Sequence, residues 1–153
     1  MSAFNGHLVS PLQGQTNTRE ASIAWSADGK RLATACPDGT VRVWNPIDGR
    51  LLSTYRGYPE ESSYYAYTVA WSPSGEQLAS FHATHHENQI ELLSNVQVWD
   101  ARTGHHICST PLDAKSHSVP AMAWSADGKR LAVNNDQGEI VVWGIRSPKL
   151  THI

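Results

Sequence analysis

The sequence predicts an all-β protein made of three copies of a four-stranded antiparallel unit. Six tryptophans among 153 residues fall into three pairs, separated by 19, 28 and 19 residues. Nearly the same phrase surrounds the first member of each pair, and Gly-containing turns separate short alternating segments without a sustained helical period. Self-similarity at a fixed spacing indicates a repeat architecture. The paired tryptophans are Trp25, Trp44, Trp71, Trp99, Trp124 and Trp143.

The repeated phrases define the unit. Residues 24–33 read AWSADGKRLA, residues 70–79 read AWSPSGEQLA, and residues 123–132 repeat the first phrase without a change. The second tryptophan of each pair ends a shorter phrase, which reads TVRVWN, NVQVWD and EIVVWG in turn. Successive units begin 46 and 53 residues apart. Each unit is therefore one supersecondary element that must stack on its neighbours to bury its apolar faces.

The first complete unit gives the order of strands and turns. Asp28-Gly29, Asp38-Gly39 and Asp48-Gly49 each end an alternating segment, and Asp-Gly pairs supply the backbone angles that tight hairpin turns need. The segment before the second tryptophan is rich in β-branched residues, as strands are. We expect four strands, over residues 22–26, 31–36, 40–45 and 50–55.

These phrases resemble the WD-repeat β-propeller family, whose blade carries a Ser-Pro-Asp-Gly-like first turn and a strand that ends in Trp-Asp. The resemblance covers essentially the whole chain and rests on three aligned copies. It implies four-stranded blades packed side by side, with the six tryptophans in the blade cores. It also implies a rigid disc for protein–protein contact in place of a catalytic centre.

One polar feature of the family is incomplete. In the family, an Asp in the second turn bonds to the His of a Gly-His pair that opens the blade. The aligned pairs here read Gly14-Gln15 and Gly57-Tyr58, and the Asp is present as Asp38 but replaced by Leu93 and Gln137 in the other units. We therefore expect these blades to depend more on apolar packing than on a buried polar network.

The whole chain, residues 1–153, is expected to form a single three-blade module. Residues 6–15 align with a fourth strand that lacks its first three, and the third unit lacks a fourth strand. The expected parts are this orphan outer strand at 6–15, blade 1 at 21–58, blade 2 at 67–115 with an insertion at 82–94, the strands of blade 3 at 119–145, and a tail at 146–153.

Three blades are too few for a closed ring, because propellers have typically about 4–8. Two chains joined head to tail would give six blades, with each chain lending its orphan strand (His7, Leu8, Val9 and Leu12) to the third blade of its neighbour. We expect such a homodimer. A trimer with nine blades, completion by a different chain, and an excerpt of a longer propeller remain alternatives.

Both insertions fall in blade 2, in loops that share one face of the ring in the family, where partners dock. Residues 57–67 read GYPEESSYYAY and carry Tyr58, Glu60, Glu61, Tyr64 and Tyr65. Tyrosine gives a large contact area with a polar tip, as interaction surfaces need. We expect a partner-binding patch here, although some tyrosines can instead start the next strand.

The second insertion contains a histidine-rich motif, H-x-x-H-H-E, formed by His82, His85, His86 and Glu87. We include these residues in the partner-binding surface. Imidazoles and a carboxylate are also metal ligands, so a metal site is an alternative. We favour a third interpretation over metal binding, in which residues 90–93 lengthen the hairpin.

Composition excludes several function classes. The net charge is −2 with 17% charged residues, so a nucleic-acid partner is not expected, and no apolar run approaches the roughly 18 residues of a membrane span. Cys36 and Cys108 form neither a disulfide framework nor a zinc ligand set, which predicts a reducing cytoplasm. No nucleophile elbow, phosphate-binding loop or cofactor motif is present, so we expect no enzyme and no cofactor.

The sequence therefore predicts a non-enzymatic protein-interaction scaffold, a half-propeller that assembles with itself and presents the loops of blade 2 to an unknown protein partner. Two alternatives stay open. One is a structural, recently amplified repeat protein without a dedicated ligand. The other is a fragment of a larger signalling protein that contains a propeller.

Overall fold

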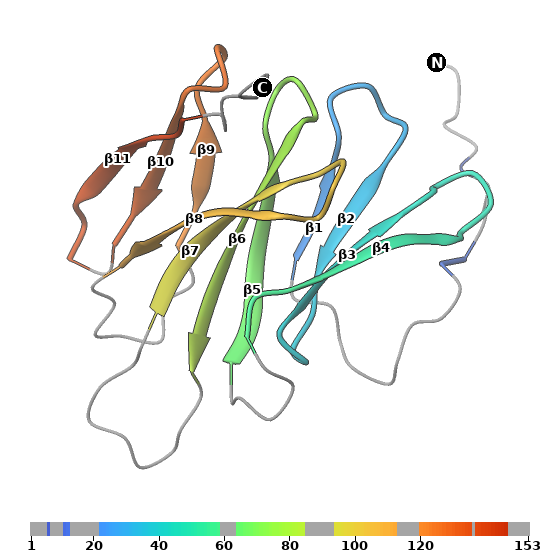
Figure 1. Cartoon of the computed structure of the whole chain (residues 1–153), viewed down its shortest axis with the longest axis horizontal. Coiled ribbons are helices and arrows are strands. Elements are labelled where there is room, and N and C mark those ends of the chain that lie inside the picture. The colour runs from blue at the N-terminus through green and yellow to red at the C-terminus, as the bar shows by residue number, and fades with distance from the viewer. Residues whose placement is uncertain are drawn as a thin grey trace, which may run out of the picture.

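A computed structural model describes residues 6, 11–12, 22–58, 64–84, 94–112, 120–135 and 137–146. These residues form three antiparallel sheets, and none of them is helical (Figure 1). The prediction of an all-β protein with four-stranded antiparallel blades is confirmed. The described residues accordingly include no helix of the length and apolarity that a membrane crossing requires.

Blade 1 has the strand order β1-β2-β3-β4. Its strands lie within one residue of the predicted bounds. Glycines at positive φ form the turns between them: Gly29 at 70°, Gly39 at 80° and Gly49 at 72°. The Asp-Gly pairs thus act as predicted, because glycine adopts this backbone region without strain. The strands are β1 (Ser22–Trp25), β2 (Leu32–Ala35), β3 (Thr40–Trp44) and β4 (Leu51–Arg56).

Blade 2 has the order β5-β6-β7-β8 and longer inner strands. They are β5 (Tyr64–Trp71), β6 (Gln77–Thr84), β7 (Ser94–Asp100) and β8 (His106–Pro111). The first strand begins at Tyr64, before the expected start of the blade at residue 67, because Tyr64 and Tyr65 pair with Thr84 and Ala83 of β6. The tyrosine-rich segment therefore belongs in part to a strand.

Blade 3 has three described strands in the order β11-β10-β9, namely β9 (Met122–Trp124), β10 (Arg130–Asn134) and β11 (Ile140–Gly144). In the expected orphan strand, His7, Leu8 and Val9 lie outside the described residues. Leu12 is described, is half-buried and is not in a strand. Strand exchange between copies therefore stays a prediction.

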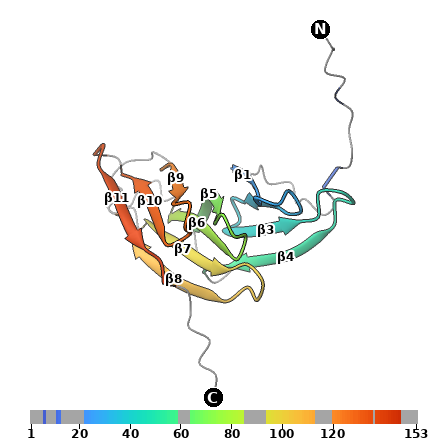
Figure 2. The same cartoon turned by 90° about the horizontal axis from the view of Figure 1, so that it is seen from above.

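The three sheets stand side by side in an arc, with β1, β5 and β9 on its concave side (Figure 2). Two apolar seams join them. The seam between blades 1 and 2 buries Ala33, Ala35, Val41, Val43, Tyr55, Ala66, Val69, Trp71, Leu78, Trp99 and Ala101. The seam between blades 2 and 3 buries Ala79, Phe81, Val96, Val98, Leu112, Leu131, Val133 and Ile145.

The tryptophans occupy these blade cores with one exception. Trp44, Trp71 and Trp99 are buried, and Trp124 and Trp143 are half-buried against the second seam. The expectation of a core position is wrong for Trp25, which is 58% exposed. The physical reason is that Trp25 lies on the face of blade 1 that points away from blade 2, where no described blade packs against it.

Candidate functional site

A compact group of polar and aromatic side chains lies where the β4–β5 connection meets the ends of β5, β6 and β7. We call Tyr58, Tyr64 and Asn95 the blade-2 rim; the ring of His82 lies next to that of Tyr58, with the two centroids 5.8 Å apart. The rings of Tyr58 and Tyr64 stack with their centroids 3.7 Å apart and their planes at 4°. The side-chain amide of Asn95 donates a hydrogen bond to the Tyr58 hydroxyl. Two tyrosines that are six residues apart in the sequence thus form one half-buried surface.

The rim is attached to blade 1 through close backbone contacts. The N–H of Ala66 donates to the carbonyl of Cys36 at 3.1 Å, which ties β5 to the second turn of blade 1. A Cβ at Gly39 would lie 2.7 Å from the carbonyl oxygen of Tyr64, and a Cβ at Gly57 would collide with the side chain of Gln97. Glycine at both positions allows the loop and strand to pack closely enough to hold the tyrosines in place.

The structure corrects the assignment of His82 to an exposed partner-binding loop. His82 lies in β6 and its side chain is fully buried. Its Nε2 atom is 2.8 Å from the hydroxyl of Ser80, which in turn accepts a hydrogen bond from the indole N–H of Trp99 at 2.9 Å. Burial lowers the pKa of His82 from 6.5 to about 4, so the imidazole is neutral near pH 7. His82 supports the rim from beneath.

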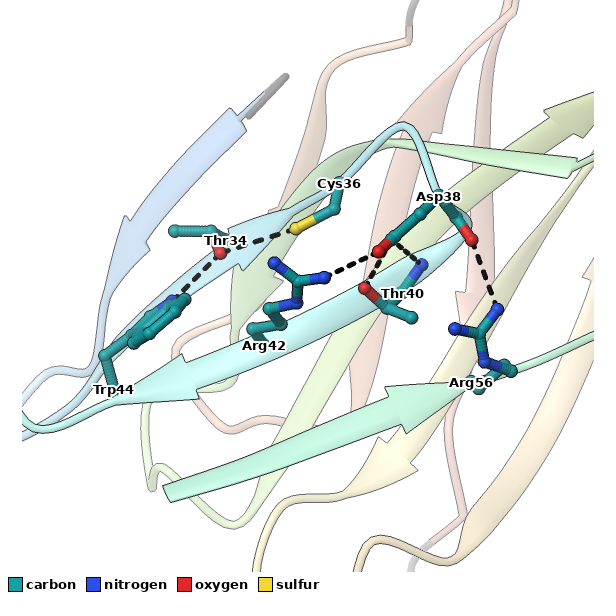
Figure 3. Close-up of polar contacts among 7 residues, drawn as sticks. All are labelled: Thr34, Cys36, Asp38, Thr40, Arg42, Trp44 and Arg56. Atoms are coloured by element: carbon teal, nitrogen blue, oxygen red, sulfur yellow. Dashed lines mark hydrogen bonds and ion pairs between the residues drawn. The ribbon is translucent and has the colours of Figure 1, made fainter. Parts of the chain in front are cut away.

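Blade 1 carries an equivalent polar chain without the histidine (Figure 3). The indole N–H of Trp44 donates to the hydroxyl of Thr34 at 3.0 Å, and the sulfur of Cys36 lies 3.8 Å from that hydroxyl. Cys36 occupies the repeat position of His82, so blade 2 gains a histidine where blade 1 has a thiol. Sequence reasoning missed this role of His82, although the alignment of the repeats contains the signal.

Asp38 anchors the second turn of blade 1 by bonds other than the Asp-His bond of the family (Figure 3). Its carboxylate accepts hydrogen bonds from the backbone N–H and the hydroxyl of Thr40 at 2.9 and 2.5 Å, and it pairs with Arg42 at 2.6 Å. Burial disfavours ionisation, but the Thr40 bonds and the Arg42 guanidinium outweigh it and hold the pKa of Asp38 below its usual value. Its backbone carbonyl accepts from Arg56 at 3.3 Å.

The remaining predicted site residues divide into two groups. Tyr65 is half-buried in β5, with its ring tilted against Tyr67 at a centroid distance of 6.1 Å, and is not part of the Tyr58–Tyr64 stack. The other group lies outside the described residues and comprises Glu60, Glu61, His85, His86 and Glu87. Within the described ranges, no three His, Cys, Asp or Glu side chains converge as metal ligands would.

Comparisons with known proteins find repeat-containing propeller proteins that match most of this chain. The family model described as the ELP1 first N-terminal beta-propeller matches residues 9–147. The target of rapamycin complex subunit wat1 of Schizosaccharomyces pombe is 35% identical over 86% of this chain and 37% of its own length. From Arabidopsis thaliana, a guanine nucleotide-binding protein subunit beta is 25% identical over 92% of this chain and 33% of its own length. The small ribosomal subunit protein RACK1z, also from Arabidopsis thaliana, is 28% identical over 92% of this chain and 43% of its own length. The chain thus spans only about a third to two fifths of these relatives.

Proposed function

The chain belongs to the WD-repeat β-propeller family, and from that premise we propose that it is a non-enzymatic scaffold for protein–protein contact that a second copy completes into a ring. The names of the three relatives describe subunits or components of larger assemblies, which supports a scaffold role. The two free cysteines, one buried and one half-buried, suit the reducing cytoplasm that we propose as its location.

The blade-2 rim is the surface that we propose for the protein partner. The observation that carries this proposal is the Tyr58–Tyr64 stack, which is held by Asn95 above the buried Ser80–His82 pair. A preorganised aromatic surface loses little conformational entropy on binding, and tyrosine also offers a hydroxyl at its edge. Glu60 and Glu61 lie between the two tyrosines in the sequence, which favours a partner with apolar and basic side chains.

The proposed second copy follows from the incomplete arc. Three blades leave one face of blade 1 and one face of blade 3 without a neighbouring blade in the described part of the chain, and Ile23 and Ile140 are 63% and 73% exposed on these faces. Exposed apolar faces of this kind mark interaction surfaces. Two copies joined head to tail give six blades, within the usual range, whereas three copies would give nine.

Replacing both rim tyrosines by alanine is expected to reduce capture of the partner on the order of 10-fold or more, because the stacked rings would supply its central contacts. The measurement compares the proteins that an immobilised wild-type chain and the Tyr58→Ala, Tyr64→Ala variant retain from an extract of its native cells. Ile47→Ser is the matched control, since Ile47 is exposed in the β3–β4 turn of blade 1, outside the rim.

The control variant should retain the same proteins as the wild type, and near-ultraviolet circular dichroism should show that both variants keep their fold. Loss of one set of proteins from the tyrosine variant alone supports the rim as the contact surface. Retention of an unchanged set by the tyrosine variant would place the contact surface elsewhere on the molecule.

A further inference from the structure

Each of the two seams inside the chain contains a hydrogen bond of the same kind. Between blades 1 and 2, the indole N–H of Trp71 donates to the carbonyl of Ala24 at 3.0 Å. Between blades 2 and 3, the indole N–H of Trp124 donates to the carbonyl of Ala70 at 3.1 Å. In both seams the donor is the first tryptophan of the later blade, and the acceptor is the alanine directly before the first tryptophan of the earlier blade.

The same rule assigns a bond to each open end of the arc. Trp25 is the equivalent donor in blade 1, and Ala123 is the equivalent acceptor in blade 3. No bond of this kind joins either one to another described residue. Trp25 is 58% exposed, whereas its repeat equivalent Trp71 is 8% exposed inside a seam. The chain therefore carries both halves of a third seam bond at opposite ends.

The side chains around these two positions also match. Ile140 and Val142 are 73% and 57% exposed on blade 3, but their repeat equivalents Val41 and Val43 are buried in the seam between blades 1 and 2. On the opposite end, exposed Ile23 is equivalent to Val69, which is buried in that same seam. Each open face thus presents the apolar residue types that the internal seams bury.

An arginine adds a third, more selective match. Arg31 donates to the carbonyl of Gly75 in blade 2 at 2.8 Å, and its guanidinium carbon lies 4.5 Å from the ring centroid of Trp71, a cation–π arrangement. Blade 2 has Gln77 at the equivalent position, but blade 3 has Arg130 within the same ten-residue phrase. Arg130 is exposed, and its equivalent targets are Gly29 and Trp25.

We propose that these features form a third seam between two copies of this chain. The indole N–H of Trp25 in one copy donates to the carbonyl of Ala123 in the other, and Arg130 of the other copy covers the Trp25 ring. Blade 1 of each copy then packs on blade 3 of its partner, which gives two identical seams and a closed two-fold ring. This inference rests on the self-assembly proposed above and specifies the surfaces that perform it.

The test uses two single variants and their mixture. Trp25→Glu places a charge on the open face of blade 1, and Val142→Glu places a charge on the open face of blade 3. Since both side chains are exposed in the chain, each variant should fold. Every seam needs one face of each kind, so each variant alone should lose association on the order of 100-fold. An equimolar mixture retains one intact seam and should regain the dimer mass. Sedimentation equilibrium measures all three samples, and Ile47→Glu is the control for an added exposed charge.

The outcomes separate this inference from self-assembly itself. A monomeric wild-type chain overturns both proposals. A dimeric wild type whose two variants also remain dimers overturns the seam alone. If only one variant loses association, the face that it changes pairs with the same face of the second copy, which contradicts head-to-tail pairing. Failure of the mixture to recover the dimer mass also contradicts head-to-tail pairing. Arg130→Ala should weaken association about 5-fold, whereas Arg31→Ala should lower the thermal midpoint of the chain by about 2–4 °C.

Discussion

Replacement of Trp99 by alanine should lower the free energy of unfolding by about 3–5 kcal/mol, the cost of deleting a large buried aromatic side chain. Trp99 is 3% exposed in the seam between blades 1 and 2. Its ring stacks on Tyr55 of blade 1 with centroids 5.9 Å apart. The ring of His106 in β8 meets it in a T-shaped arrangement, with centroids 5.3 Å apart. Its loss would open a cavity between two blades and remove the hydrogen bond to Ser80.

Trp143 is the matched control, because it occupies the same repeat position in blade 3. The residue equivalent to Ser80 is Val133 there, and the buried indole N–H of Trp143 has no hydrogen-bond partner among the described residues. Phenylalanine removes the N–H at either position. Trp99→Phe should therefore cost about 1–2 kcal/mol, whereas Trp143→Phe should be nearly neutral or slightly stabilising.

Urea unfolding at one fixed protein concentration measures these differences, since the stability of an associating chain depends on its concentration. Equal losses for the two phenylalanine variants would contradict the assignment of the hydrogen-bonded chain to blade 2. A loss below about 1 kcal/mol for Trp99→Ala would contradict the placement of Trp99 in the blade core.

Acidification from pH 6.5 to pH 4 should destabilise the chain by about 3 kcal/mol through His82 alone. Burial lowers the pKa of His82 to about 4 in the folded chain, while an unfolded histidine titrates near 6.5. Between these values the unfolded state binds the proton and the folded state does not, so stability rises with pH across this window. Above pH 6.5 the His82 contribution is fully present, and it is lost as the pH falls towards 4.

The variant His82→Cys is the sharpest check, because blade 1 carries Cys36 at the same repeat position. This variant should lose the part of the slope of stability against pH that His82 contributes in that window, whatever its stability at pH 7. The control His105→Gln alters an exposed histidine and should keep the slope. The measurement is a series of urea transitions from pH 4 to pH 7.5. An unchanged slope in His82→Cys would show that His82 is not buried as a neutral group.

The sequence predicted the local structure of the blades well, because local structure follows from alternation and turn residues. The Asp-Gly pairs place Gly29, Gly39 and Gly49 at positive φ, and the strands of blade 1 lie within one residue of expectation. The exposure of Trp25 could not be predicted from the repeat, since Trp25 and Trp71 share the same phrase. Their difference in burial depends on whether another blade packs against them, which is a property of the tertiary arrangement.

The candidate site was predicted in part. Tyr58 and Tyr64 lie together, but an insertion in the sequence does not reveal whether its residues form a loop or lengthen a hairpin. β5, β6 and β7 are longer than the inner strands of blade 1, which moves His82 from an expected loop into the core and Tyr65 away from the stack. The strand periodicity was too short in this segment to distinguish these cases.

The native mass of the 153-residue chain tests the central claim most directly, because three blades cannot form a closed ring without further blades. Sedimentation equilibrium over a range of micromolar concentrations gives this mass independently of shape. The proposed head-to-tail ring predicts a species of twice 16.8 kDa. A well-behaved monomer of 16.8 kDa at every concentration would contradict it.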